Sequence, residues 1–319
     1  MANYKDIHGA LIETVSSDPS DPVNGQVWYN STSQALKGFK ENPAGSWATG
    51  NDMGTARQGV EGFGTQTAAI AVGGYPPFTG KTESYDGTNW TEVADLNTAR
   101  AWLGAAGIST AGLAYGGEST LHAVSELWNG SGWTEVGDLN TARLNNAGSG
   151  TSTAALSVGG YITAQQDITE TYNGSAWTEV ADLNQARYSM GSANQAPNTA
   201  SLVFGGATPR RTLTESWNGS AWTEVADLNT AREGLNAGGT SPAAVAFAGH
   251  TGSPTAVTES WNGSAWTEVA DLNNATNDVG GAGSSTAALS MGGYRPPGQV
   301  AATEEFTAPL ETTVTFTVS

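Results

Sequence analysis

An aspartate and an arginine recur together along the chain, and such a pair could form an ion pair, a catalytic carboxylate or an anion site. Each Asp lies five residues before its Arg in Asp52 and Arg57, Asp95 and Arg100, Asp138 and Arg143, Asp182 and Arg187, and Asp227 and Arg232. In a sixth copy, Asp271 is followed by Thr276. A catalytic centre needs unlike environments that drive pKa values apart, and identical copies offer the reverse. We therefore predict that the pairs are structural and fix the crossing between repeats, with an anion site formed by the arginines as the alternative.

These pairs belong to an eleven-residue segment, Trp90 to Arg100, that returns almost unchanged around four later tryptophans. A worn copy, Trp47 to Arg57, opens the series. The tryptophans at 47, 90, 133, 177, 222 and 266 lie 43, 43, 44, 45 and 44 residues apart. This period indicates one structural unit of that length, repeated along the chain.

The composition favours an all-β protein. Gly is abundant, with 42 residues of 319, and Thr, Val, Tyr and Trp occur in short runs bounded by Asn-Gly and Gly-Gly. Each repeat can be divided into a Gly- and Ala-rich strand, an apolar strand ending in a small pair such as Gly73-Gly74, a third strand ending at an Asx-Gly turn, and a fourth strand beginning at the Trp. Four strands per repeat predict a β-propeller.

The repeats resemble kelch repeats, in which a Gly-Gly pair ends the second strand and an aromatic residue precedes the turn. The aromatic residues that carry this resemblance are Tyr85, Trp128, Tyr172, Trp217, Trp261 and Phe306. The resemblance covers about residues 47–307 and implies a fold but no function. The last repeat ends without its Trp strand, which Trp47 to Gly54 can supply. We therefore predict a six-bladed, kelch-like propeller closed by an N-terminal strand, which removes two sheet edges that would otherwise be exposed.

Three segments are expected: an N-terminal arm and β-hairpin at residues 1–46, the propeller at 47–310, and a C-terminal strand at 311–319. The run 16–22 contains two prolines and is predicted to be extended. Strand-like runs at 26–30 and 35–39 flank a Ser-Thr-Ser-Gln turn and predict the hairpin. Alternating Val, Phe and Thr predict the last strand, which pairs either with the hairpin or with a neighbouring chain.

Charge and composition exclude several classes of function. The formal net charge of −18 disfavours nucleic acid and anionic lipid as partners. Each repeat adds one Glu before the turn, one Glu after the Trp and one Asp, so we expect a solvated acidic surface. The chain has no Cys, and its three histidines show no metal-ligand spacing, so no metal or cofactor is expected. No stretch approaches the length of a membrane span or a signal peptide.

The loops that follow the six small pairs differ in length, charge and aromatic content, whereas the strands are nearly duplicated. Because strands alternate in direction, all six loops should emerge on one face beside the arginines. Diverse loops on a uniform scaffold are typical of a recognition surface, although exposed loops also drift freely. Tyr and Arg are favoured at interfaces. The predicted binding residues are Tyr75, Phe78, Lys81, His122, Tyr161, Gln165, Arg210, Arg211, His250, Tyr294 and Arg295.

Residues 18–38 resemble the leader of structural proteins of marine bacteriophages, in which a Gly-Gln-hydrophobic-Trp-Tyr-Asn hairpin, here Gly25 to Asn30, often precedes a fibre or repeat domain. The resemblance implies a virion protein that is assembled in the host cytoplasm. It would dock to other virion proteins through residues 1–46, with 311–319 as a second candidate contact and a homo-oligomer as a further expectation.

The predicted function is that of a non-enzymatic tail or surface appendage that contacts a host-surface glycan or protein through the loops. One alternative is a passive capsid or tail decoration protein that binds no receptor. Another is a glycan-degrading enzyme, in which two carboxylates would converge from different repeats.

Overall fold

The structure, a computed structural model, describes residues 12–21, 23, 25–42 and 44–316, and these residues form strands, bridges and turns with no helix. The all-β prediction is confirmed. The chain divides into two compact units, residues 1–46 with 308–319, here the terminal unit, and residues 47–307, here the repeat unit. The described strands form seven four-stranded sheets and one two-stranded sheet, and six of the four-stranded sheets belong to the repeat unit.

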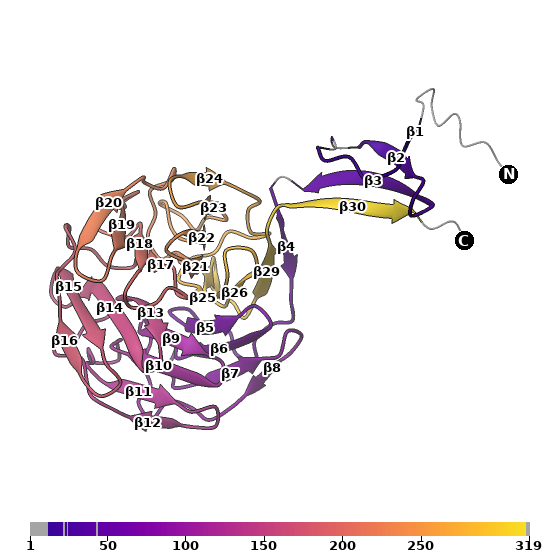
Figure 1. Cartoon of the computed structure of the whole chain (residues 1–319). Helices are drawn as coiled ribbons and strands as arrows, with labels where there is room; N and C mark the ends of the chain where they lie inside the picture. The colour runs from indigo at the N-terminus through magenta and orange to yellow at the C-terminus, as the bar shows by residue number, and fades with distance from the viewer. Residues whose placement is uncertain (1–11, 22, 24, 43, 317–319) are drawn as a thin grey trace. The chain divides into compact units, whose positions relative to one another are not determined.

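The six sheets of the repeat unit lie around a common centre, with their first strands innermost (Figure 1). The first strands are β5 (Glu61–Thr65), β9 (Gly104–Ile108), β13 (Ala147–Thr151), β17 (Gly191–Ser192), β21 (Asn236–Thr240) and β25 (Gly280–Gly283). The second strands are β6 (Ala68–Val72), β10 (Ala111–Tyr115), β14 (Ala154–Tyr161), β18 (Leu202–Phe204), β22 (Ala243–Phe247) and β26 (Ala288–Met291). This arrangement is propeller-like.

Neighbouring strands within each of these sheets run antiparallel, as the alternation along the chain predicts. The third strands are β7 (Thr82–Tyr85), β11 (Ser125–Trp128), β15 (Gln165–Tyr172), β19 (Thr214–Trp217), β23 (Thr258–Trp261) and β29 (Thr303–Thr307). The fourth strands are β8 (Trp90–Glu92), β12 (Trp133–Glu135), β16 (Trp177–Glu179), β20 (Trp222–Val225), β24 (Trp266–Glu268) and β4 (Ser46–Thr49). The two-stranded sheet pairs β27 (Tyr294–Arg295) with β28 (Gly298–Gln299) in the loop between β26 and β29.

The last sheet has the order β25-β26-β29-β4, so its fourth strand comes from the N-terminal side of the repeats. The prediction that the worn copy at Trp47 supplies the missing strand is confirmed. Trp47 is 6% exposed, and its ring lies 5.1 Å from Phe247 and 5.2 Å from Phe306. The Trp47 ring therefore contacts both the sheet that it completes and the sheet before it.

The tryptophans that open the fourth strands connect each sheet to the sheet before it. Every indole Nε1 donates to a hydroxyl on the third strand of the preceding sheet, at 2.9–3.2 Å. The pairs are Trp90 with Thr303, Trp133 with Thr82, Trp177 with Ser125, Trp222 with Thr169, Trp266 with Thr214, and Trp47 with Thr258. These six hydrogen bonds join each sheet to its neighbour and together form a closed circle through all six sheets.

Small residues on the first strands allow the sheets to approach one another at the centre. A Cβ atom on Gly148 of β13 would lie 2.3 Å from the Tyr115 hydroxyl and 2.7 Å from the Ala105 carbonyl oxygen. The Tyr115 hydroxyl donates to the Leu156 carbonyl at 2.7 Å. The Gly- and Ala-rich composition of these strands therefore follows from the close contact between neighbouring sheets.

The sheet of the terminal unit has the order β1-β2-β3-β30, formed by β1 (Glu13–Val15), β2 (Val27–Asn30), β3 (Ala35–Asn42) and β30 (Leu310–Phe316). Strands β2 and β3 form the predicted hairpin, with Trp28 opposite Lys37. β30 pairs antiparallel with β3 of the same chain, which is the first of the two pairings considered for the C-terminal strand. Residues 1–11 of the predicted arm, and residues 317–319, lie outside the described residues.

Asp18 connects the proline-rich segment to this hairpin. Its carboxylate accepts hydrogen bonds from Trp28 Nε1 at 3.0 Å, Asn30 Nδ2 at 2.7 Å and Lys37 Nζ at 2.6 Å. The bonds from Lys37, Asn30 and Trp28 lower the pKa of Asp18 to about 2. Trp28 is fully buried, so Asp18 satisfies the one polar atom of an otherwise apolar side chain.

Candidate functional site

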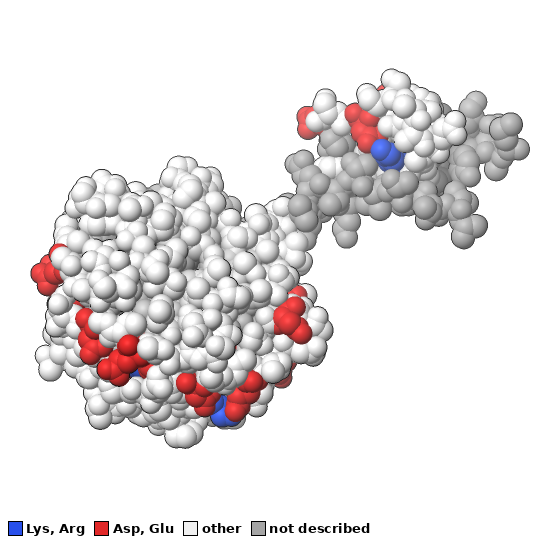
Figure 2. Space-filling model, turned by 60° about the horizontal axis from the view of Figure 1, so that its bottom comes forward, with Lys and Arg blue, Asp and Glu red and all other residues white. Residues whose placement is uncertain are grey.

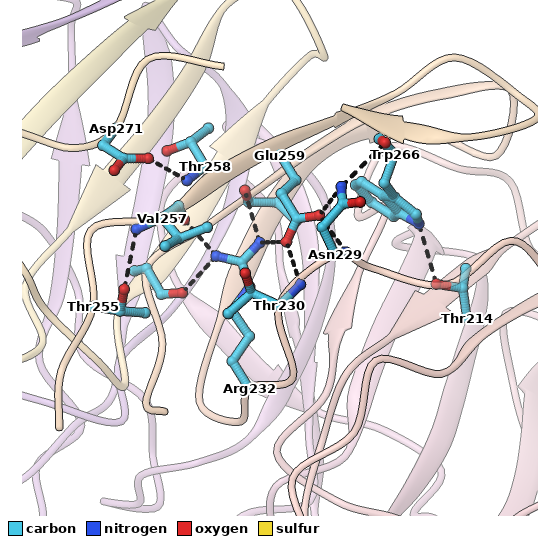
Figure 3. A network of polar contacts seen from close by, with 12 residues as sticks. Thr214, Asn229, Thr230, Arg232, Thr255, Val257, Thr258, Glu259, Trp266 and Asp271 are labelled. Carbon is cyan, nitrogen blue, oxygen red and sulfur yellow. Dashed lines mark hydrogen bonds and ion pairs between the residues drawn. The ribbon is translucent and has the colours of Figure 1, made fainter. Parts of the chain in front are cut away.

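The repeated arginines are buried and bind glutamates. Arg232 Nη2 lies 3.2 Å from Glu259 Oε1, and the guanidinium also donates to the carbonyls of Ala248 and Val257 (Figure 3). Both side chains are 0% exposed. Burial lowers the pKa of Arg232 to about 10, and the Glu259 charge opposes this shift, so the guanidinium remains charged at neutral pH.

Each of these glutamates also fixes the turn that precedes the arginine. Glu259 Oε2 accepts from the Asn229 N–H at 2.7 Å and from Asn229 Nδ2 at 2.8 Å, and that amide also donates to the Trp266 carbonyl at 3.1 Å. Equivalent ion pairs join Arg57 to Glu83, Arg100 to Glu126, Arg143 to Glu170, and Arg187 to Glu215. The ion pair therefore connects the crossing segment to the third strand of the next sheet.

The predicted Asp–Arg pairing is wrong. Asp227, five residues before Arg232, accepts from the Thr214 N–H at 3.1 Å in its own sheet, while Arg232 binds Glu259 of the next sheet. The same aspartate contact recurs as Asp95 with Thr82, Asp138 with Ser125, Asp182 with Thr169, and Asp271 with Thr258 (Figure 3). The physical reason is that the chain crosses from one sheet to the next between the Asp and the Arg. The Asp therefore contacts the sheet that the chain is leaving, and the Arg contacts the sheet that it enters.

Two further expectations about charge are corrected. The Glu before each turn is not solvated, since Glu83, Glu126, Glu170, Glu215 and Glu259 are 0–2% exposed. An anion site formed by the arginines is also contradicted, because the arginines are at most 1% exposed and already bind carboxylates. The Glu after each Trp is exposed, and acidic side chains gather along the rim of the repeat unit (Figure 2).

A closed ring of backbone hydrogen bonds lies at the centre of the repeat unit. It is formed by the residues two positions after each arginine or its Thr276 counterpart, here the mouth ring: Gly59, Trp102, Asn145, Ser189, Gly234 and Asp278. Each N–H donates to the carbonyl of the ring residue before it, at 2.8–3.0 Å. All six residues have φ between 51° and 60°, in the left-handed region. Each sheet thus contributes one residue to the ring.

The variable loops are attached beside this ring. The first residue of every loop forms a β-bridge with the residue just before a mouth-ring residue. The bridges are Gln58 with Tyr75, Ala101 with Glu118, Leu144 with Tyr161, Tyr188 with Ala207, Glu233 with His250, and Asn277 with Tyr294. All six loops therefore begin on the face of the repeat unit that carries the ring, here the loop face.

A cavity of about 370 Å³ opens at this face, here the mouth pocket. Its lining includes Trp102 and Glu118 of the second repeat, together with Glu233, His250 and Asp278 of two other repeats. Burial, followed by the nearby Glu233 charge, raises the pKa of Asp278 to about 6. The pocket therefore combines one aromatic wall with several hydrogen-bond acceptors, which is the usual composition of a small-ligand site.

Some of the predicted binding residues meet at this pocket. Tyr75 and Phe78 pack on Trp102, with ring centroids 5.7 and 6.2 Å away. Arg210 lies 3.0 Å from Glu233, and its Nη2 is 2.9 Å from His250 Nδ1. These four residues therefore surround or line one site.

The other predicted residues are not part of the pocket lining. Lys81 pairs with Glu92 at 2.7 Å, and Arg211 donates to Gln185 at 2.6 Å. His122 bonds Ser119 at 2.7 Å, and burial, aided by the Arg100 charge, lowers its pKa. The remaining residues are tied to the scaffold: Tyr161 packs on Tyr188, Gln165 accepts from the Thr208 N–H, Tyr294 bridges Asn277, and Arg295 donates to Thr276 Oγ1.

The mouth-ring residues and Glu233 were not among the residues predicted from the sequence. The repeats did contain a signal, because the ring position is occupied by Gly, Asn, Ser or Asp in five of six copies. Gly, Asn and Asp tolerate a left-handed backbone best. Trp102 is the exception, since an aromatic residue with φ of 51° is unfavourable unless its surroundings hold it there.

Below the ring, Glu61 extends from β5 into the centre and meets Asn236 from β21. Asn236 Nδ2 donates to Glu61 Oε1 at 3.1 Å, which also accepts the Gly62 N–H at 3.1 Å. The intervening strand β25 allows this contact because a Cβ at Gly281 would lie 2.4 Å from Asn236 Oδ1. Burial raises the pKa of Glu61 to about 7 against these hydrogen bonds.

Because of this raised pKa, the Glu61 contribution to stability should fall as pH rises from about 4.5 to about 7 and stay level above that. In this range the folded chain holds a proton that the unfolded chain releases. Glu61→Gln keeps an acceptor for Asn236 and removes the titration. We expect the variant to lose less stability than the wild type between pH 5 and pH 7.5, by ~1–3 kcal/mol, in urea unfolding. Parallel stability curves for the two proteins would contradict this expectation.

No protein-family model and no curated protein matches this chain. Within residues 12–316, apart from the undescribed positions 22, 24 and 43, no group of three or more His, Asp or Glu side chains could hold a metal ion. No helix that could span a membrane occurs in the same part of the chain.

Proposed function

We propose that this chain is a bacteriophage virion protein whose kelch-like propeller presents its variable loops to a glycan or protein on the host surface. The observation that carries the proposal is the division of roles along each repeat. The repeated Arg and the Glu before each turn are buried, and the repeated Trp are buried or partly buried between sheets, whereas all six loops begin beside the mouth ring and its pocket. Diverse loops on such a scaffold are suited to recognition.

We also propose that the repeat unit has six blades. Two closed series support this count, because the tryptophan contacts and the mouth ring each visit six sheets once and return to their start. The seventh four-stranded sheet belongs to the terminal unit and contributes to neither series. The residues that would make the repeats kelch-like are the paired glycines and the aromatic residues at the turns.

The terminal unit is the proposed attachment to the particle. The support is the leader-like segment 18–38, together with its own sheet and its buried Trp28 anchored by Asp18. Its partners would be other virion proteins. The particle would be assembled in the host cytoplasm and would carry the loops outside.

One deletion tests the docking role of residues 1–46, and a separate set of loop replacements tests the recognition role of the loops. Phage particles carrying the chain without residues 1–46 should lose the protein, because its docking segment is gone. Particles in which the loops at Tyr75, Arg210 and Tyr294 are replaced by short Gly-Ser turns should keep the protein and adsorb poorly to host cells. Normal adsorption of the loop variants would instead indicate a passive decoration protein, and retention of the truncated chain would contradict the docking role.

A glycan-degrading enzyme is the second candidate, favoured by the carboxylates of Glu118, Glu233 and Asp278 around one pocket. The raised pKa of Asp278, about 6, would suit a general acid. Purified protein should be incubated with host envelope polysaccharide, and new reducing ends should be counted. We expect none; release that disappears in Asp278→Asn would establish the enzyme instead.

A further inference from the structure

We propose that the mouth pocket binds a sugar ring without an acid group, with Trp102 stacked on the apolar face of the sugar and the pocket carboxylates accepting its hydroxyls. This inference rests on the proposed function, because it names the ligand class of the loop face. It places recognition at the centre of that face, at residues that belong to different sheets.

The aromatic wall is the first step. The Trp102 ring lies over Gly59, whose Cβ would be 2.7–2.9 Å from ring atoms. Tyr75 and Phe78 pack around it, with Tyr75 and Phe78 centroids 5.0 Å apart. Trp102 is thus held by neighbours while it still lines the pocket. An indole fixed in this way offers a flat apolar surface at little cost in side-chain entropy.

The other residues of the pocket lining supply hydrogen-bond acceptors. Ionised carboxylates only accept hydrogen bonds, and the hydroxyls of a sugar can donate them. Asp278 Oδ2 is held by Asn277 Nδ2 at 2.7 Å, and Glu233 is held by Arg210 at 3.0 Å. Groups fixed before the ligand arrives lose little freedom when it binds. A cavity of about 370 Å³ suits a small ligand.

The charge of the pocket selects among sugars. Glu118, Glu233 and Asp278 lie on the lining, and the guanidinium of Arg210 neutralises Glu233. The remaining negative charge would repel a sialic acid, uronic acid or sulfated sugar inside a partly desolvated site. We therefore expect neutral saccharides to bind more tightly than their acidic analogues.

The mouth ring itself provides a variant that should fold. Asn145 occupies the equivalent position with φ of 55°, and Trp102 has φ of 51°. Trp102→Asn therefore removes the aromatic wall while the left-handed backbone becomes easier to adopt. Trp102→Phe retains an aromatic ring. Tyr29→Asn, at an exposed aromatic residue of the terminal unit, is a matched control.

The test uses the full chain on an array of neutral oligosaccharides and their sialylated counterparts, followed by calorimetry with the best neutral ligand. Wild-type protein and Tyr29→Asn should bind alike, and the acidic counterpart should bind at least about tenfold more weakly. Trp102→Asn should weaken binding by about tenfold or more, while Trp102→Phe stays within about threefold. Thermal unfolding of each variant checks that it is folded.

Four results would overturn the inference. Three concern the saccharides: no neutral saccharide bound by the wild type, unchanged binding in Trp102→Asn, or tighter binding of the acidic counterparts. The fourth is binding of choline and not of sugar, because a cation would then be the ligand. Each result leaves the proposed function standing if the loop variants still abolish adsorption to cells. If the wild type binds no saccharide and the loop variants adsorb normally to cells, both the sugar inference and the proposed function are wrong.

Discussion

Replacement of Arg100 by Met should reduce the free energy of unfolding by ~3–5 kcal/mol, the usual cost of leaving one member of a buried ion pair alone. Arg100 Nη1 lies 2.6 Å from Glu126 Oε1, and both side chains are 0% exposed. Methionine fills much of the space but leaves the Glu126 charge without its cation. Urea unfolding at neutral pH measures the loss.

Two companion variants make this result specific. Glu135→Gln removes an exposed carboxylate from the adjoining strand and should change stability by no more than ~0.5 kcal/mol. Arg100→Met combined with Glu126→Leu should remain destabilised, because Glu126 also accepts from the Asn97 N–H at 2.7 Å and the Thr98 N–H at 3.3 Å. If the double variant regains wild-type stability, the carboxylate does not hold the crossing segment.

Replacement of Trp47 by Ala should cost ~3–5 kcal/mol, since a large buried aromatic side chain is lost from the strand that closes the last sheet. The indole packs edge-on against Phe247 and donates to Thr258 Oγ1 at 3.2 Å. Its carbonyl accepts from Asn273 Nδ2 at 3.2 Å. Amide hydrogen exchange should accelerate first in β29 and β4, where the ring would open.

Trp47→Phe should be milder, because it keeps an aromatic ring near Phe247 and Phe306 and loses the bond to Thr258, for a cost of ~1 kcal/mol. Ile108→Ala, at a 54% exposed side chain of the second sheet, should leave exchange in β29 unchanged. If amide exchange in Trp47→Ala accelerates equally in all six sheets, the pairing of β4 with β29 is no less stable than the other sheets.

The order of the strands in the repeat unit could be predicted because local residue patterns mark where each strand begins or ends. Asx-Gly turns, paired glycines and the tryptophan delimit the strands, and a worn Trp47 copy was enough to locate the closing strand. The partner of Arg100 could not be predicted from spacing, since Glu126 lies 26 residues away and Asp95 only five. A Glu at the same place in every third strand was the available signal for a buried partner.

The candidate site was only partly predictable for a similar reason. Tyr75, Phe78, Arg210 and His250 stand out because their loops vary, and they do lie at or beside the mouth pocket. Trp102 and Asp278 occupy the same position in two repeats, and in the sequence alone this position looks like an ordinary strand position. Their convergence depends on closing the six sheets around one centre, which no single repeat encodes.

A density map of the assembled phage particle tests the central claim most directly, because that claim assigns opposite tasks to two parts of the chain. We expect the terminal unit to contact other virion proteins, and the loop face, with Trp102 and the mouth pocket, to be turned to the solvent outside the particle. A map in which the loop face is covered by neighbouring virion proteins, or in which the chain is absent from purified particles, would contradict it.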